Sequence, residues 1–247
     1  MFLKEFNLAK ITATKTAKML QKKYMSDTIV ITNKDKDIKT EADYAAHNFI
    51  VDSLHHTDIR IVSEEGTYQK FNLDDRQWII DPIDGTYNLS RGFNEAAVSI
   101  SLWDEGLPVF GVIHHLFSND VFSSFISQGA YKNNKSIALN SVENKKEATL
   151  ATGFSNGRDF SKSSLGSLII DFQKYKKIRM IGSAALMLSY VACGYFDVYK
   201  EEDIYIWDVA AGLAIVSGAN GKYLIEPGSR KMQYNIKAAN KSLIDKV

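Results

Sequence analysis

The sequence is poor in several features, and each scarcity excludes a class of protein. Cys193 is the only cysteine, so no intrachain disulfide can form and nothing points to an oxidising compartment. Three prolines and no low-complexity stretch in 247 residues argue against a disordered linker. No uncharged apolar run approaches the ~18 residues of a membrane span, and Lys4 and Glu5 interrupt any signal-peptide core. We therefore expect a cytoplasmic protein.

An excess of charge of either sign is also missing. Lys and Arg number 30 and Asp and Glu 29, for a net charge of +1, which gives no general attraction to nucleic acid or membranes. We expect neither as a partner. Hydrophobic residues make up 45% of the chain, enough for one substantial core at this length. We expect a single domain, residues 1–247, with an N-terminal lobe of about 1–140 and a C-terminal lobe of about 141–247.

Hydrophobic periodicity predicts the elements of these lobes. Residues 2–24 place apolar side chains at three- or four-residue steps, which is typical of an amphipathic helix. Thr40 followed by Asp43 matches the start of a second helix. The later elements that we expect are strands at 96–103, 107–116, 121–126, 148–154, 178–181, 196–199 and 222–225, and helices at 165–176, 184–192 and 208–217. The first three strands predict an antiparallel meander, and the later alternation predicts an α/β lobe.

One stretch, Trp78–Leu89, combines features of a ligand-binding turn. It begins with an apolar run typical of a buried strand and breaks at Pro82, which cannot donate to a strand ladder. Asp81 and Asp84 lie three residues apart across this break, and Gly85 follows at once. Carboxylates suit Mg²⁺, and free N–H groups at the turn suit a phosphate. An ordinary Asp-Pro turn is the alternative, because Asp, Pro and Gly are common turn residues.

Other acids occur where they can join this turn. Glu64 and Glu65 follow a strand expected at 59–62, and Asp208 begins a late helix. Four or more clustered acids would repel one another without cations, which is the physical reason to expect a metal. Asp43 is equally well explained as a first-turn carboxylate that the helix dipole favours.

Taken together, these segments resemble the signature of the inositol monophosphatase family, the Mg²⁺-dependent, lithium-sensitive phosphatases. The matching blocks are Thr40–Asp43, Glu64–Glu65, Asp81–Thr86, Arg179–Ala185, Gly194–Asp197 and Trp207–Gly212. They follow the family's order and extend over nearly the whole chain. The resemblance implies an α/β fold, a layered α-β-α-β-α sandwich of the inositol monophosphatase and fructose-1,6-bisphosphatase type, which is often paired as a homodimer.

The resemblance also implies a role for each site residue. The ligands of two or three Mg²⁺ ions would be Glu65, Asp81, the Ile83 carbonyl, Asp84 and Asp208. The Gly85 and Thr86 N–H groups would hold the phosphate. The Thr86 hydroxyl, backed by Asp43, would position and deprotonate the attacking water, and Glu65 would help to hold a third ion through water. The substrate contacts would be Asp84, Glu201, Ala184 and Ser155.

Some positions depart from the family pattern or do not align with it. Tyr87 and Leu89 replace the Thr and Phe that usually follow the catalytic Thr, which changes the pocket wall but no metal ligand. The family's upstream lysine aligns with neither Lys34 nor Lys36 without a gap. Lysines in a charged loop are often only solvated, so the phosphate contact stays open between these two.

The expected activity is hydrolysis of a small polyol or sugar phosphate such as inositol 1-phosphate. Phosphatases of 3′-phosphoadenosine 5′-phosphate, histidinol phosphate or fructose bisphosphate share the metal motifs and are the alternatives. They differ in the loops around residues 155–164 and 201–206. An alternative of another class is a non-catalytic regulator that uses the same fold to bind protein or RNA; the presence of every expected ligand argues against it.

Overall fold

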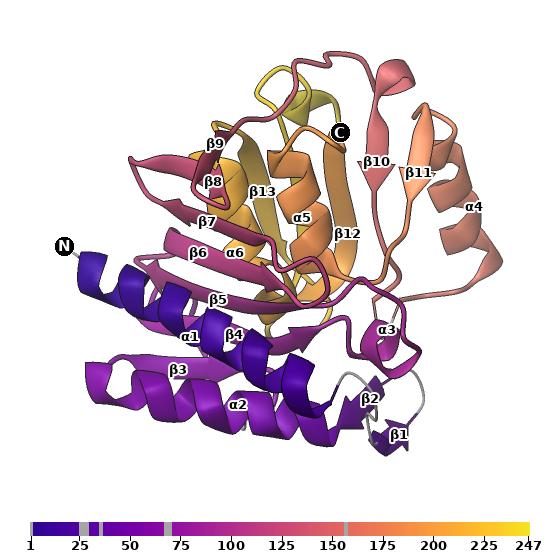
Figure 1. Cartoon of the computed structure of the whole chain (residues 1–247). Helices are drawn as coiled ribbons and strands as arrows, with labels where there is room; N and C mark the ends of the chain where they lie inside the picture. The colour runs from indigo at the N-terminus through magenta and orange to yellow at the C-terminus, as the bar shows by residue number, and fades with distance from the viewer. Residues whose placement is uncertain (1, 25–29, 35–36, 67–70, 156–157) are drawn as a thin grey trace.

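Helices and sheets form five stacked layers. The computed structural model of the protein describes residues 2–24, 30–34, 37–66, 71–155 and 158–247. Two helices, α1 (Leu3–Lys23) and α2 (Glu41–Leu54), cover one face of a seven-stranded sheet (Figure 1). Between that sheet and a five-stranded sheet lie α5 (Ala184–Ala192) and α6 (Ile206–Gly218), and α4 (Lys162–Phe172) lies outside the second sheet. The expected α-β-α-β-α sandwich is confirmed.

The seven-stranded sheet has the order β3-β4-β5-β6-β7-β8-β9. Its strands are β3 (Arg60–Ser63), β4 (Gln77–Asp84), β5 (Ala97–Asp104), β6 (Leu107–His115), β7 (Val121–Phe125), β8 (Gly129–Lys132) and β9 (Lys135–Ile137). Strands β3 and β4 run parallel, and the other neighbours run antiparallel, which confirms the predicted meander. The parallel pair places the ends of β3 and β4 at the same edge of the sheet, where the acids lie.

The five-stranded sheet has the order β11-β10-β12-β14-β13. Its strands are β10 (Thr149–Ala151), β11 (Lys177–Arg179), β12 (Val198–Tyr205), β13 (Lys222–Pro227) and β14 (Gln233–Ala239). Strand β10 pairs in parallel with β11 and β12, and β14 pairs antiparallel with β12 and β13. The sequence analysis missed β14, because its buried positions, including Gln233, Ile236 and Ala238, do not alternate strictly.

The outer helices bury the stripes that the sequence predicts. The helix expected over 2–24 is confirmed as α1, whose buried residues include Phe6, Ala9, Ala13, Ala17 and Leu20. It packs on β5 and β6, whereas α2 packs on β4. These contacts enclose one hydrophobic cluster around Trp78 and Phe110. The result is a rigid support on the back of the strand that carries Asp81 and Asp84.

The central helices are apolar on nearly every side because sheets cover them from both directions. Helix α5 has the expected bounds, and α6 begins at Ile206, two residues before the expected start. Asp208 therefore lies within the first turn of α6. Both helices belong to the largest hydrophobic cluster, which joins the two sheets.

Several short elements complete the described chain. They are a hairpin of β1 (Val30–Lys34) and β2 (Asp37–Thr40), the helix α3 (Thr86–Ser90), and three 3₁₀ turns, η1 (His55–Thr57), η2 (Lys145–Glu147) and η3 (Ile244–Lys246). Among the described residues, no helix has the length and apolar character needed to cross a membrane.

Candidate active site

Three carboxylates from distant segments meet at the edge where β3 and β4 end. Glu64 follows β3, Asp81 lies in β4, and Asp208 lies in the first turn of α6. One carboxylate oxygen from each lies within 4.8 Å of the others. Hard oxygen donors at such spacing fit a divalent cation such as Mg²⁺ or Ca²⁺ better than a soft metal. The residues present therefore fit a metal ion.

The pKa values of the carboxylates in this cluster also indicate a cation site. Burial, and then the neighbouring carboxylates, raise the pKa of Glu64 to about 8. Burial also raises the pKa of Asp81 and of Asp208 well above the ordinary value, and the nearby Glu64 and Asp84 raise both further. These acids cannot all carry their charge at neutral pH without a compensating cation. The cluster therefore favours binding of a cation.

Asp84 connects the cluster to the start of α5. Its Oδ2 accepts hydrogen bonds from the Ser183 hydroxyl at 2.5 Å and from the Ala185 N–H at 2.8 Å. Ser183 is itself the N-cap of α5, so the carboxylate lies where the helix dipole favours negative charge. Burial nevertheless raises the pKa of Asp84 to about 6, against the effect of these donors. Asp84 therefore links the end of β4 to the start of α5 at the site.

Thr86 and Asp43 form the contact that sequence alone left open. The Thr86 hydroxyl donates to Asp43 Oδ1 at 2.8 Å and also lies 2.9 Å from the Ile83 carbonyl oxygen. The other Asp43 oxygen accepts from the Thr40 N–H and hydroxyl, at 2.7 and 2.6 Å. Asp43 is therefore both a helix-capping carboxylate and the partner of Thr86. Its burial raises its pKa, and the hydrogen bonds from Thr40 and Thr86 oppose that rise.

Gly85 allows the chain to turn from β4 into α3. It adopts a φ of +89°, and a Cβ there would lie 2.7 Å from the Glu95 carbonyl oxygen. Both the backbone conformation and the close approach therefore require glycine. The turn places the N–H groups of Gly85 and Thr86 at the beginning of α3, where helical geometry leaves donors without a partner inside the helix.

Glu201 lies on β12 and faces the same region. Its Oε2 accepts from the Tyr199 hydroxyl at 2.9 Å. The pKa of Glu201 is raised to about 7, chiefly by burial and also by Asp84, whereas Tyr199 and Arg158 oppose the rise. A Cβ on Gly153 would lie 2.7 Å from the carboxylate, so a larger residue at this position would displace the Glu201 side chain. The segment after β10 is thereby packed directly on Glu201.

Comparison with known proteins identifies the family to which this fold belongs. A family model described as the inositol monophosphatase family matches residues 3–245. The chain belongs to the inositol monophosphatase family. A Xylella fastidiosa protein named Nus factor SuhB is 37% identical over 196 residues, covering 78% of this chain and 70% of that protein. A Thermotoga maritima fructose-1,6-bisphosphatase/inositol-1-monophosphatase is 36% identical over 189 residues, covering 75% of this chain and 70% of that protein.

Solved structures agree with the family assignment. The structure of inositol monophosphatase from Anabaena has a TM-score of 0.84 and 27% identity, covering 98% of this chain and 93% of that chain. Membership in the inositol monophosphatase family supports hydrolase and phosphatase activity at the level of the family. The acid cluster of Glu64, Asp81 and Asp208 agrees with metal dependence.

The structure places the two adjacent glutamates differently from the ligand set that the resemblance implied. Glu64, not Glu65, gathers with Asp81 and Asp208. Glu65 instead accepts from Lys39 Nζ at 2.8 Å, and its side chain is only 3% exposed. Adjacent residues at a strand end point in different directions, so only one of the two reaches the cluster. Lys39 was not among the lysines considered, and the side chains of Lys34 and Lys36 lie outside the described residues.

The remaining expected residues surround this centre. Ala184 opens α5, and its backbone N–H lies beside the Asp84 carboxylate. Ser155 is buried two residues beyond Gly153, and its hydroxyl has no hydrogen-bond partner among the described residues. Tyr87 is exposed on α3, whereas Leu89 is buried in the core behind it.

Asn88 has a positioning role that the sequence analysis missed. Its side-chain amide donates to the carbonyl oxygens of Glu95 and Ile181, both at 2.7 Å. These bonds tie α3 to the loop that leads into α5. The signal was present in the motif, where an Asn follows Thr86 by two residues, but its partners are distant in sequence.

Proposed function

We propose that the protein is a Mg²⁺-dependent phosphomonoesterase that acts on a small polyol or sugar phosphate of the inositol 1-phosphate kind. One observation carries this proposal: the Thr86–Asp43 hydrogen bond lies beside a cluster of acids that needs cations. A purely structural role explains neither the buried acids nor the hydroxyl directed at Asp43. The family assignment of the chain supports phosphatase chemistry at this turn.

We assign the metal ligands from the geometry and the resemblance together. They are Glu64 in place of Glu65, Asp81, the Ile83 carbonyl, Asp84 and Asp208. When bound, Mg²⁺ supplies Lewis acidity toward the phosphate and lowers the pKa of a water molecule. The raised pKa values of the acids mean that metal binding is accompanied by loss of protons from the cluster.

Thr86 and Asp43 form a relay for the proton that the attacking water must lose. The Thr86 hydroxyl has one proton and two acceptors, Asp43 Oδ1 and the Ile83 carbonyl. If the carbonyl serves as a metal ligand, Asp43 is left as the acceptor for Thr86. The Thr86 oxygen then offers its lone pairs to the attacking water, and Asp43 accepts the proton through the hydroxyl.

The substrate is held from two sides in this proposal. The Gly85 and Thr86 N–H groups receive the phosphate oxygens, as anions are received at helix starts. Glu201, Ser155 and the Ala184 backbone receive the hydroxyl groups of the leaving alcohol. Buried Glu201 can accept one hydroxyl, and the unpartnered Ser155 hydroxyl can donate to another. A polyol satisfies both groups at once.

Phosphate release from a panel of phosphomonoesters tests the proposal. The panel contains inositol 1-phosphate, fructose 1,6-bisphosphate, 3′-phosphoadenosine 5′-phosphate and histidinol phosphate, each with Mg²⁺ and with EDTA. We expect the highest kcat/KM for a polyol or sugar phosphate, complete loss in EDTA, recovery with Mg²⁺ and inhibition by lithium. Undiminished turnover in excess EDTA after dialysis would refute metal dependence.

The adjacent glutamates provide a matched pair for the ligand assignment. Glu64→Gln should weaken Mg²⁺ binding at least tenfold, measured by calorimetry, because it removes a charged ligand. Glu65→Gln changes the same charge one residue away and should alter Mg²⁺ affinity only a few-fold. The reverse order of effects would restore Glu65 as the ligand.

A regulatory protein is the second candidate, favoured by the similarity to a protein named Nus factor SuhB. In that case binding of a protein or RNA partner would carry the function, whether or not phosphate is released. Pull-down with the wild type and with Thr86→Ala separates the two. A partner retained equally by both, together with no turnover of any panel member, would favour the regulator.

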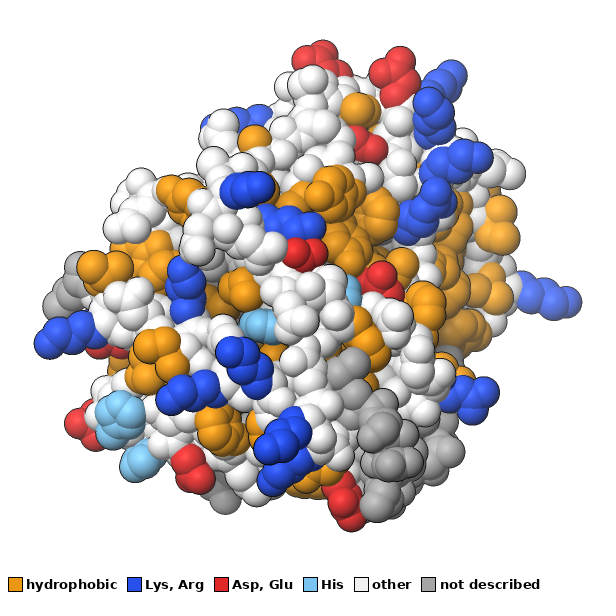
Figure 2. Space-filling view, in the orientation of Figure 1, with side chains coloured by type: hydrophobic (Ala, Val, Ile, Leu, Met, Phe, Trp, Pro, Cys, Tyr) orange, Lys and Arg blue, Asp and Glu red, His pale blue; other side chains and the backbone are white. Residues whose placement is uncertain are grey.

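We also propose that the protein forms a homodimer through the face at α4 and the edge strand β11. Figure 2 shows hydrophobic side chains gathered at the right of the view, over α4. Ile169 is 57% exposed and Met180 44% exposed, and a group of exposed apolar side chains on one face is typical of an interaction site. Light scattering with Ile169→Glu tests this: a dimer should become a monomer, and an unchanged mass would exclude this face.

A further inference from the structure

A second concave site lies away from the acid cluster and is lined mainly by cations. The pocket has a volume of about 780 Å³ and is formed by η2, the end of α4 and η3. Its lining residues are Glu143, Asn144, Lys145, Lys146, Ile170, Gln173, Lys174 and Lys246. Four of these eight are lysines and one is acidic. The volume falls within the range of pockets that hold small organic ligands.

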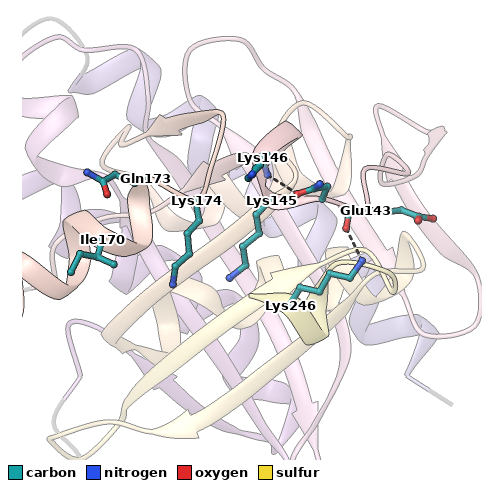
Figure 3. A pocket seen from close by; sticks show the side chains of 8 residues that line it. Glu143, Lys145, Lys146, Ile170, Gln173, Lys174 and Lys246 are labelled. Atoms are coloured by element: carbon teal, nitrogen blue, oxygen red, sulfur yellow. Dashed lines mark hydrogen bonds between the residues drawn. The ribbon is translucent and has the colours of Figure 1, made fainter.

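Two of these lysines, Lys145 and Lys174, extend side by side on one side of the pocket. In Figure 3 the Lys145 and Lys174 side chains extend in the same direction, the Lys246 side chain runs toward the Glu143 backbone, and the Glu143 carboxylate points away. The ammonium of Lys246 donates to the Glu143 backbone oxygen at 2.8 Å. Lys146 is anchored through its backbone N–H, which donates to Asn144 Oδ1 at 3.0 Å. These bonds hold the Glu143–Lys146 segment against η3, so one wall of the pocket is fixed.

Carboxylates do not balance this charge. Asp171 forms ion pairs with Lys174 at 3.3 Å and with Lys200 at 2.6 Å, so one acid serves two lysines. Lys145 makes no ion pair among the described residues, and its ammonium lies 5.4 Å from the centre of the Tyr175 ring. Burial lowers the pKa of Lys145; Asp171 opposes this, and Lys174, Lys200 and Lys237 lower it further. An anion placed here would relieve that repulsion.

A buried hydroxyl beside the pocket lacks a partner. Tyr175 is 7% exposed, it lies directly under Lys145, and its hydroxyl has no hydrogen-bond partner among the described residues. A buried donor without a partner costs free energy unless water or a ligand satisfies it. Lys145 and Tyr175, which lie against each other, thus both carry donors for which the described residues supply no acceptor.

The pocket and the candidate active site lie on opposite faces of the second sheet. Lys200 and Glu201 are consecutive residues of β12, so their side chains point to opposite faces. Glu201 faces the acid cluster, whereas Lys200 faces Asp171 on α4. A ligand at the lysines would therefore not compete with a substrate for the same space.

We propose that this pocket binds a small organic molecule with two or more phosphate groups, such as a nucleoside diphosphate. Lysine ammonium groups suit phosphate oxygens as point charges. Several ammonium groups around one space fit a polyanion better than a single phosphate. The amides of Asn144 and Gln173 and the apolar surface of Ile170 line the rest of the pocket and can contact the organic portion. This site does not depend on the phosphatase assignment.

Calorimetric titration of ADP into the metal-free protein tests the proposal. EDTA leaves the acid cluster without cations, so that anions are repelled from the candidate active site and binding elsewhere is measured. We expect saturable binding of ADP and pyrophosphate, with orthophosphate at least tenfold weaker. Lys145→Met with Lys174→Met should weaken ADP about tenfold or more, since each removes a charge-assisted contact.

Two control variants test whether the loss of ADP affinity is specific to the pocket. Lys15→Met with Lys22→Met removes the same charge from exposed positions on α1 and should change ADP affinity less than twofold. Asp84→Asn, in the acid cluster, should also leave it unchanged. Thermal melts of each variant confirm that the fold is retained.

Four outcomes would overturn the proposal. These are no saturable ADP binding below about 1 mM, equal weakening by the two double variants, a clear change of ADP affinity in Asp84→Asn, and tight binding of an RNA oligonucleotide that ADP does not displace. The last would assign the lysines to a nucleic-acid surface instead.

Discussion

Replacing Asp84 by Asn should separate the stability of this fold from its function. Asp84 is 7% exposed, and burial raises its pKa from 3.8 to about 6. In the absence of metal, the ionised Asp84 carboxylate therefore destabilises the folded state relative to the unfolded state, in which water solvates it. Asn keeps the shape and an oxygen acceptor for Ser183 and Ala185 but removes the charge. We expect the metal-free variant to be more stable than the wild type near neutral pH, and inactive.

The expected difference in the free energy of unfolding follows from the pKa shift of Asp84. Because the folded-state pKa lies above the unfolded value, stability from this group is complete below about pH 4 and is lost as pH rises to about 6. A shift of about 2 units corresponds to about 3 kcal/mol above pH 6 and about 1 kcal/mol at pH 4.5. Weaker hydrogen bonds to a neutral acceptor should remove about 1 kcal/mol at every pH. Asp84→Asn should thus gain about 2 kcal/mol at pH 7.5 and nothing at pH 4.5.

Urea unfolding followed by circular dichroism measures this difference. The wild type and Asp84→Asn are compared at both pH values in EDTA, and again at pH 7.5 with Mg²⁺. Metal that binds only the folded wild type stabilises it by about 2.7 kcal/mol at 100 times the dissociation constant. Mg²⁺ should therefore cancel or reverse the advantage of the variant.

Two results would refute the reasoning. A metal-free variant less stable than the wild type at pH 7.5 would show that the Asp84 charge is already compensated within the chain. Turnover like that of the wild type would reduce Asp84 to a turn and capping residue.

The remaining predictions concern the residues around Asp84. Thr86→Ala and Asp43→Asn should each lower kcat at least a hundredfold, and the double variant should be little worse than the worse single, because the two act as a unit; additive losses in kcat would separate them. Lys39→Met should lower the free energy of unfolding by about 1–2 kcal/mol, since it leaves the buried Glu65 carboxylate without its ammonium partner; Lys39→Arg should restore most of it, and equal losses in a urea titration would contradict the pairing. Gly85→Ala should cost at least about 2 kcal/mol, because it combines a φ of +89° with a 2.7 Å contact to a carbonyl oxygen; a thermal melt unchanged from the wild type would contradict this.

Local patterns were sufficient for most elements of this fold. Helix α1 repeats its apolar residues at helical spacing, and α5 lies between Ser183 and Gly194 with the expected bounds. The hairpin strands β5, β6 and β7 were predictable because each is a short apolar run between turn residues. Strand β14 was not, because it owes its place to pairing with β12 and β13 rather than to its own alternation.

The choice between Glu64 and Glu65 shows the limit of local reasoning at the site. The sequence predicts a carboxylate at the end of β3, but the side chains of two adjacent acids point to opposite sides of the chain. Which of them faces Asp81 depends on the parallel register of β3 with β4 and on the position of Lys39. No periodicity within the chain contains that information.

The sequence by itself determined the irregular pairing of β4 between Asp81 and Asp84, because Pro82 has no N–H to donate, and the turn at Gly85, because glycine adopts a positive φ without strain. It also determined that acids lie at strand ends and helix starts. Only the tertiary structure decided which groups meet: the Thr86 hydroxyl with Asp43, the Asp84 carboxylate with Ser183, and four lysines around one pocket. The physical reason is that backbone conformation is set by neighbours in the chain. Hydrogen bonds and repulsion between charges depend instead on distance in space, which packing of the two sheets around α5 and α6 creates.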